Sequence, residues 1–396
     1  MPVPTPIPER DPALLHEAHA LRAAFEPYAT LRELHASAEW PALAPRLAAL
    51  LTHVRTCAPA TPAAPPSAPP GGSTRLQVAH WNIEHGNQFD AIAVALATES
   101  GLAGVDLITL NEVDLGMARS GNRDVAGELA AQLGLHSVWA PMFLESTRGR
   151  DDDLLTAVPD DNAESLFGLA MLSRWPVTGV QLVPLPGPER TLFERERMAG
   201  RFVALVCEIA HPTQPFVAVT AHLEVHRTRA HRARQMRLLL AALTDERRPV
   251  VLTGDWNTHT FDRGESHSVL SAAWALVASP RATIRQRLIR PDEGPRRETL
   301  FEELAAAGFA WKSYTDQAPT LGMRFSRLGE VQALPGPLRA LASSGMHWVE
   351  RRTRLRLDWI ATRGFDPAAG RGRTLRGLDG PGLASDHAPV VAELAP

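Results

Sequence analysis

Apolar residues recur every three or four positions near the start of the chain, and in short β-branched runs over the remaining four-fifths. The first pattern occupies residues 11–55 and opens with Asp11 and Pro12, a capping residue followed by a first-turn proline. We therefore expect short helices there, interrupted at Pro27 and Pro41.

Residues 58–74 separate the two patterns and consist mainly of Pro, Ala, Ser and Gly. Such a composition cannot bury a core and is typical of a linker. The sequence thus predicts three parts: a helical N-terminal extension over residues 1–57, the linker 58–74, and a main domain over residues 75–396.

In the main domain, short apolar runs alternate with helical patterns. The expected strands are Leu76–Asn82, Val105–Asn111, Leu166–Ser173, Arg201–Ile209, Phe216–Leu223, Val250–Gly254, Leu355–Thr362 and Val390–Glu393. The expected helices include Phe89–Glu99, Val125–Leu133 and Arg229–Leu243. Adjacent strand pairs with only some intervening helices predict an α/β protein with mixed sheets.

Composition narrows the class of protein. Hydrophobic residues make up 44% and charged residues 21% of the chain, the balance of an ordinary globular protein. No apolar run reaches the length of a membrane span, and the first residues lack the features of a secretory signal, so we expect a cytoplasmic location. A net charge of −3 gives no global attraction for polyanions, which argues against a dedicated binder of duplex DNA.

Polar side chains follow several of the expected strands. Asp255 and Asn257 come at the end of an apolar run, and Asn82 and Glu84 follow another. In an extended segment, positions i and i+2 share one face, so each pair is expected to converge on one bound group. Taken alone, a Gly-Asp sequence after a strand is more often a simple turn.

Further polar residues of the same chemical kind follow other apolar runs or, in the case of Asp386 and His387, lie in a loop just before the last strand. They are Glu112, His222, Asp358, Asp386 and His387. Carboxylates and amide oxygens without thiolates suit a hard cation such as Mg²⁺ or Mn²⁺, and histidines can donate protons or stabilise a charged transition state.

Six segments in this order carry a resemblance to a known family. They are Trp81-Asn82-Ile83-Glu84, Asn111-Glu112-Val113-Asp114, Thr220-Ala221-His222-Leu223, Gly254-Asp255-Trp256-Asn257, Leu357-Asp358-Trp359-Ile360 and Ser385-Asp386-His387-Ala388-Pro389. Together they resemble the endonuclease/exonuclease/phosphatase superfamily, the metal-dependent phosphoesterases similar to DNase I and AP endonucleases. The resemblance implies a four-layer α/β sandwich, in which two packed mixed sheets are flanked by helices and the active site lies at one end.

The resemblance also implies roles for these residues. Glu112 corresponds to the principal metal ligand, with Asn82 and Glu84 beside it, while Asp386 contacts the metal or fixes its loop. The implied cofactor is Mg²⁺ or Mn²⁺.

The catalytic roles are likewise implied by the resemblance. Asp255 orients or deprotonates the attacking water, and Asn257 donates a hydrogen bond to a phosphate oxygen. His387, polarised by Asp358, stabilises the pentacoordinate phosphorus or acts as an acid, and His222 lies near the phosphate and the leaving group.

Several tryptophans and histidines beside the motifs are expected to lie around the site and to take no direct part in catalysis. Trp81, Trp256 and Trp359 each flank a site residue and are expected to pack beneath it. His85 and His259 lack a family counterpart and are expected at the surface or behind the site.

The predicted activity is hydrolysis of a phosphoester, most simply by a phosphodiesterase or nuclease acting on nucleic acid or a nucleotide-derived ester. A phosphomonoesterase, or a phosphodiesterase for lipids or inositol phosphates, is the alternative, and a non-catalytic binding module on the same fold is a second one. The sequence leaves open the substrate, the number of metals and the oligomeric state. It also leaves open the roles of residues 1–57 and 261–354.

Overall fold

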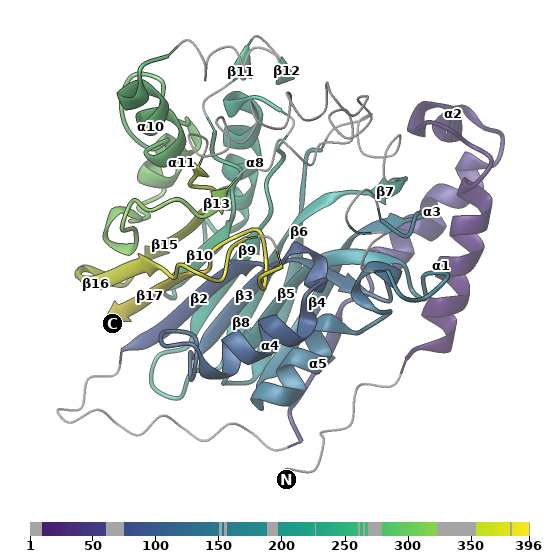
Figure 1. Ribbon diagram of the computed structural model, residues 1–396, viewed down its shortest axis with the longest axis horizontal. Helices are drawn as coiled ribbons and strands as arrows, with labels where there is room; N and C mark the ends of the chain where they lie inside the picture. Colours follow the sequence, from purple (N-terminus) through teal and green to yellow (C-terminus); the bar gives the residue numbers. More distant parts are fainter. Residues whose placement is uncertain are drawn as a thin grey trace.

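The computed structural model shows how the chain builds two mixed β-sheets that pack face to face (Figure 1). It describes residues 10–60, 75–149, 153, 157–187, 197–225, 227–259, 262–263, 266–267, 279–322, 354–380 and 382–395. Most of the expected linker and much of the segment 261–354 lie outside these residues.

The larger sheet has the strand order β1-β4-β5-β3-β2-β17-β16, and β7 pairs with β4. Its strands are β1 (Arg55–Cys57), β2 (Leu76–Asn82), β3 (Leu107–Leu115), β4 (His136–Glu145), β5 (Leu166–Ser173), β7 (Met198–Gly200), β16 (Asp366–Thr374) and β17 (Val390–Ala395). Strands β2 and β3 run parallel, whereas β17 is antiparallel to β2. The carboxyl ends of β2 and β3 therefore lie at one edge of the sheet.

The smaller sheet has the order β15-β10-β9-β8-β6. Its strands are β6 (Val177–Leu185), β8 (Phe202–Ile209), β9 (Phe216–Ala221), β10 (Val250–Asp255) and β15 (Asp358–Arg363). Strands β9 and β10 are parallel, and β15 is antiparallel to β10. Two short ribbons pair β11 (Asp262–Arg263) with β12 (Ser266–His267) and β13 (Leu321–Gly322) with β14 (Arg354–Leu355).

Helices cover the outer faces of both sheets. Helices α4 (Phe89–Thr98) and α5 (Val125–Leu133) pack on the larger sheet, and α8 (Arg229–Ala242) and α11 (Leu300–Ala306) pack on the smaller one (Figure 1). The main domain also contains helix α10 (Arg281–Ile289) and the short 3₁₀ turns η1 (Glu84–Gly86), η2 (Ala118–Ser120) and η3 (Lys312–Tyr314). The expected four-layer α/β sandwich is confirmed.

The N-terminal helices are α1 (Pro12–Phe25), α2 (Leu31–Ala36) and α3 (Trp40–Leu50). Asp11 caps α1 as expected, but Pro41 lies in the first turn of α3, where a missing N–H costs nothing, so its expected role as a helix breaker is wrong. The buried residues of these helices share one apolar cluster with Trp139 and Leu144 of β4. Strand β1 also pairs with β4, so this segment packs directly on the larger sheet.

The expected strands and helices are present, with small shifts at their ends. The sequence did not predict the longer strands β4, β6 and β16, nor the short strands β1, β7, β11, β12 and β13. Strand β16 is largely exposed and lies at the edge of its sheet, so its sequence carries no apolar alternation. Among the described residues no helix combines the length and apolarity that a membrane crossing requires.

The layer between the two sheets changes from apolar to polar along β2. The side chains of β2 that point between the sheets are Leu76, Val78, His80 and Asn82. Leu76 and Val78 belong to the hydrophobic core between the sheets. His80 and Asn82 contact residues of the smaller sheet instead. This polar end of the layer, at the carboxyl ends of β2, β3 and β10, contains the candidate site.

Candidate active site

Asp255, the last residue of β10, lies at the centre of the polar layer and is 2% exposed. Its backbone N–H donates to Asn111 Oδ1 at 2.8 Å, and its Oδ1 accepts the backbone N–H of Asn257 at 2.9 Å. These bonds fix the carboxylate and leave the other oxygen, Oδ2, directed at the remaining site residues.

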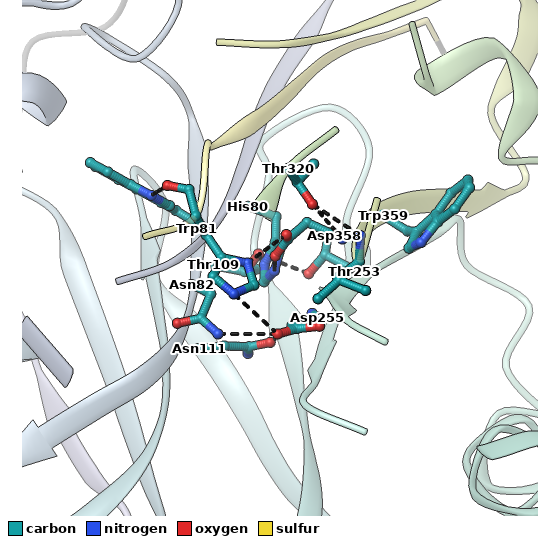
Figure 2. A network of polar contacts seen from close by, with 12 residues as sticks. His80, Trp81, Asn82, Thr109, Asn111, Thr253, Asp255, Thr320, Asp358 and Trp359 are labelled. Atoms are coloured by element: carbon teal, nitrogen blue, oxygen red, sulfur yellow. Dashed lines mark hydrogen bonds and ion pairs between the residues drawn. The ribbon is translucent and has the colours of Figure 1, made fainter. Parts of the chain in front are cut away.

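Three side chains surround Asp255 Oδ2. Asn82 Nδ2 donates to it at 3.1 Å, while His222 Nε2 and His387 Nε2 lie 3.7 and 3.8 Å away. Figure 2 shows Asn82 and Asp255 reaching toward each other from the two sheets. The structure thus gathers four of the predicted residues around one oxygen atom.

Neither of the two i, i+2 pairs is extended, so that part of the sequence reasoning is wrong. Asn257 has φ of 48° and donates from Nδ2 to the carbonyl of Leu223 at 2.8 Å. Glu84 has φ of 46°, begins η1, and donates its backbone N–H to Asn82 Oδ1 at 3.2 Å. Both turns are closed by an Asn or Asp side chain that accepts a backbone N–H two residues on, a common way to end a strand.

His387 and Asp358 form a buried pair. His387 Nδ1 lies 2.8 Å from Asp358 Oδ2. Burial alone would raise the pKa of Asp358, but the charge and hydrogen bond of His387 outweigh it, so the pKa is lowered. Burial would likewise lower the pKa of His387, yet the charges of Asp358 and Asp386 raise it well above the usual range. The pair is therefore an imidazolium and a carboxylate.

Glu112 occupies a bulge in β3, where the pairing with β5 shifts between Asn111 and Val113. It has φ of 52°, and its Oε1 accepts from Asn82 Nδ2 at 2.9 Å. Burial first, and then the charge of Asp386, raise the pKa of Glu112 to about 8. Without a cation, this carboxyl group is therefore mostly protonated at neutral pH.

His222 and Asp386 complete the site. His222 Nε2 lies 3.9 Å from Glu112 Oε1, and burial lowers the pKa of His222, so this imidazole is neutral near pH 7. Asp386 Oδ1 lies 4.0 Å from His387 Nε2, and the Asp386 side chain is 32% exposed. Asp386 is the most accessible carboxylate of the group.

The donor set suits a hard cation. Two sets of side chains, Glu112 with His222 and Asp255, and Asp255 with Asp358 and His387, have ligand atoms within 4.8 Å of one another. Four carboxyl side chains (Glu112, Asp255, Asp358 and Asp386) lie around the imidazolium of His387, and a proton on Glu112 relieves part of the repulsion among them. A divalent cation would relieve it more fully.

The structure supports two other predicted metal ligands, Asn82 and Glu84, less directly. Asn82 presents Nδ2, and not its oxygen, to Glu112 and Asp255, so coordination by Asn82 would require its amide to turn over. Glu84 is half-buried on η1, beside the cluster in sequence. The metal roles of both residues stay predictions.

Sequence reasoning assigned no role to several residues that hold the site. His80 is fully buried beside Asp358, Thr109 and Thr253 link the two sheets, and Asn111 binds both Asp255 and Thr220. Alternate residues of a strand lie on the same face of the sheet, so His80 and Thr109, two residues before Asn82 and Asn111, could have been identified from the sequence.

The sequence also predicts where the tryptophan and histidine rings next to the site lie. Trp81, Trp256 and Trp359 are buried, and the rings of Trp256 and Trp359 stack with centroids 6.2 Å apart, so their packing beneath the site is confirmed. His85 Nε2 lies 3.5 Å from Glu112 Oε2, and buried His259 contacts Arg232 of α8. Both histidines therefore lie beside or behind the site.

A model of the Endonuclease/Exonuclease/phosphatase family matches residues 79–387, and this range contains the whole cluster around Asp255. The chain belongs to the endonuclease/exonuclease/phosphatase family. Members of this family are generally hydrolases. No curated protein matches the sequence.

Several solved structures resemble this chain at low sequence identity. An endonuclease/exonuclease/phosphatase protein from Beutenbergia cavernae DSM 12333 has 19% identity and a TM-score of 0.46, over 81% of this chain and 71% of that chain. Sphingomyelinase C from Streptomyces griseocarneus has 15% identity and a TM-score of 0.43, over 81% and 99%. The 3′ phosphatase NExo from Neisseria, bound to a product DNA hairpin, has 16% identity and a TM-score of 0.46, over 81% and 99%.

Proposed function

We propose that this chain is a divalent-metal-dependent phosphodiesterase or nuclease that directs water onto phosphorus in line with the leaving group. The observation that carries the proposal is the arrangement around Asp255 Oδ2, which faces His222 Nε2 at 3.7 Å and His387 Nε2 at 3.8 Å. A fixed carboxylate oxygen between two imidazoles suits the positioning of a water molecule beside a phosphate group.

Asp255 is proposed to orient and deprotonate the attacking water. Its Oδ1 is held by the backbone N–H of Asn257 at 2.9 Å, so Oδ2 is the oxygen that accepts the proton. The side chain of Asn257, now bonded to the carbonyl of Leu223, is proposed to donate to a phosphate oxygen after it rotates.

His387 is proposed to stabilise the negative charge that develops on the phosphoryl oxygens, or to protonate the leaving oxygen. Its positive charge is maintained by Asp358, which accepts from Nδ1 and leaves Nε2 directed into the site. Neutral His222 is proposed to bind near the phosphate and the leaving group.

Glu112 and Asp386 are proposed as the main protein ligands of Mg²⁺ or Mn²⁺, with Asn82 and Glu84 as further ligands. The raised pKa of Glu112 supports this assignment, because burial and then the neighbouring charges of Asp386 and Asp255 disfavour its ionised form, and a bound cation would offset both. A bound divalent ion would neutralise the phosphate and polarise its P–O bonds.

The test is turnover of a panel of phosphoesters by the wild-type protein and by Asp255→Asn. The panel holds bis-p-nitrophenyl phosphate, p-nitrophenyl phosphate, single- and double-stranded DNA, RNA and inositol phosphates, each with Mg²⁺, Mn²⁺ or EDTA. We expect diester turnover that EDTA abolishes and that Asp255→Asn lowers by about a hundredfold or more, since general bases contribute on this scale.

The exposed Asp245→Asn provides the matched control and should leave turnover unchanged. Equal turnover by wild type and Asp255→Asn on every substrate would refute the proposal. Turnover of the monoesters alone would replace the diesterase by a phosphomonoesterase.

A further inference from the structure

His80 is a fully buried histidine in the layer between the two sheets, and the proposed reaction does not use it directly. It projects from β2 toward the smaller sheet, where its Nε2 lies 3.3 Å from Asp358 Oδ1. His387 Nδ1 lies 2.8 Å from the other oxygen of the same carboxylate. Asp358 is thus held between two imidazole rings, as Figure 2 shows for His80 and Asp358.

The opposite nitrogen of His80 begins a chain of hydroxyl groups. His80 Nδ1 lies 3.0 Å from Thr109 Oγ1, which lies 2.8 Å from Thr253 Oγ1 (Figure 2). All three side chains are buried. The chain crosses from β2 through β3 to β10, so it joins the larger sheet to the smaller one directly behind Asp255.

The pairing of atoms points to one tautomer. Neither His80 Nε2 nor Asp358 Oδ1 has a hydrogen-bond partner with good geometry in the described part of the chain, although both atoms are buried. Buried polar atoms without partners are costly, and a lone pair on Nε2 would repel the carboxylate. A proton on Nε2 would satisfy both atoms after a small turn of the imidazole ring, because the two atoms are 3.3 Å apart but are not aligned for a hydrogen bond. Nδ1 then faces the Thr109 hydroxyl at 3.0 Å.

We infer that His80 is a positioning residue that donates from Nε2 to Asp358 Oδ1 and so fixes the carboxylate that orients His387. The hydroxyl groups of Thr109 and Thr253 also contact the carbonyl oxygens of Ala79 and Val219, at 3.3 and 3.0 Å. With both of its oxygens engaged, the Asp358 carboxylate cannot rotate, and His387 Nε2 is held toward Asp255 Oδ2, 3.8 Å away. The effect on catalysis rests on the proposed function, whereas the effect on the His387–Asp358 bond does not.

Two substitutions separate this role from simple packing. His80→Gln places an amide N–H near the former Nε2 and can still donate to Asp358, whereas His80→Asn places its amide near the former Nδ1 and contacts only Thr109. We expect His80→Asn to lower kcat on bis-p-nitrophenyl phosphate by about tenfold to a hundredfold with little change in KM, the scale of a hydrogen bond to a charged group. His80→Gln should restore most of that loss.

Proton NMR supplies a readout that does not depend on turnover. The proton shared by His387 Nδ1 and Asp358 should give a strongly deshielded resonance, identified by its absence in His387→Asn. This resonance should move or broaden in His80→Asn and remain near its wild-type position in His80→Gln. Thr109→Val, which keeps the imidazole but removes the hydroxyl, should move it in the same direction by less.

His136→Gln, a histidine replacement elsewhere in the same sheet, serves as the control and should change neither readout. An unchanged resonance in both His80→Asn and Thr109→Val would overturn the inference, as would equal losses of kcat in the Asn and Gln variants. Should the wild-type protein hydrolyse no phosphoester, the proposed function would fail, but the resonances would still decide the role of His80.

Discussion

The two sides of the site differ in how their charges are balanced. On one side, Asp358 is paired with the imidazolium of His387 at 2.8 Å and is fully buried. On the other side, burial and then the carboxylates of Asp386 and Asp255 raise the pKa of Glu112 to about 8. The His387–Asp358 side is complete within the protein, whereas the Glu112–Asp386 side has an excess of negative charge.

This difference indicates which part of the chemistry each side contributes. A charge pair that exists before substrate binds can stabilise a transition state without reorganising. A group of carboxylates that takes up a proton in the absence of a cation is prepared to bind one. Substitutions on the two sides should therefore have different consequences for stability and metal binding.

The largest effect is expected from breaking the His387–Asp358 ion pair. Asp358→Asn leaves the His387 imidazolium buried without its counter-ion, so the free energy of unfolding should fall by about 3–5 kcal/mol. Urea denaturation at pH 7 measures this change. The exposed Asp366→Asn, on the neighbouring strand β16, should change stability by no more than about 0.5 kcal/mol.

The double variant Asp358→Asn/His387→Gln tests the cause of that loss. It removes both charges, so it should be more stable than Asp358→Asn alone. A double variant that is less stable than Asp358→Asn would show that the loss arises from packing and not from an unpaired charge.

The next effect concerns the side with excess negative charge. Glu112→Gln should weaken Mn²⁺ binding by at least about tenfold, because it removes the proposed main ligand, and His387→Gln should weaken it less. Calorimetric titration measures both affinities, with the exposed Glu99→Gln as a control. A greater loss in His387→Gln than in Glu112→Gln would remove Glu112 as the principal ligand.

The sequence predicted the layers of the fold well and the local geometry of the site less well. The apolar periodicity of the sequence defined β2 and α5 to the residue. Strand β3 was expected to end at Asn111 but continues to Leu115 through the bulge that holds Glu112. A bulge depends on pairing with β5 and leaves no sign in local hydrophobicity.

The contacts between side chains of the two sheets could not be predicted from the sequence either. Asn82 meets Asp255 across 173 residues of chain, and His80 meets Asp358 between the sheets. Residue types and family order indicated that Asp255, His222 and His387 belong to one site, but only the packed sheets show which atoms face one another. The side-chain turn from Asp255 to Asn257 likewise replaced an expected extended segment.

The remaining prediction is a pH dependence on the Glu112 side. In the metal-free protein the pKa of Glu112 is about 8, against 4.5 for an ordinary Glu side chain. Between these values the folded state binds more protons than the unfolded state, so stability should fall as the pH rises, by up to about 1.4 kcal/mol per pH unit. Below pH 4.5 the group is protonated in both states and adds no slope.

The difference between wild type and Glu112→Gln isolates this contribution, because His387, whose pKa is also raised, titrates in both proteins. Urea denaturation in EDTA from pH 5 to pH 8 should give a steeper decline for wild type than for Glu112→Gln. Saturating Mn²⁺ should remove the extra decline, since the ion binds the ionised carboxylate and displaces its proton. Parallel curves for the two proteins in EDTA would mean that Glu112 is ionised without a metal, and the charge contrast between the two sides of the site would then be lost.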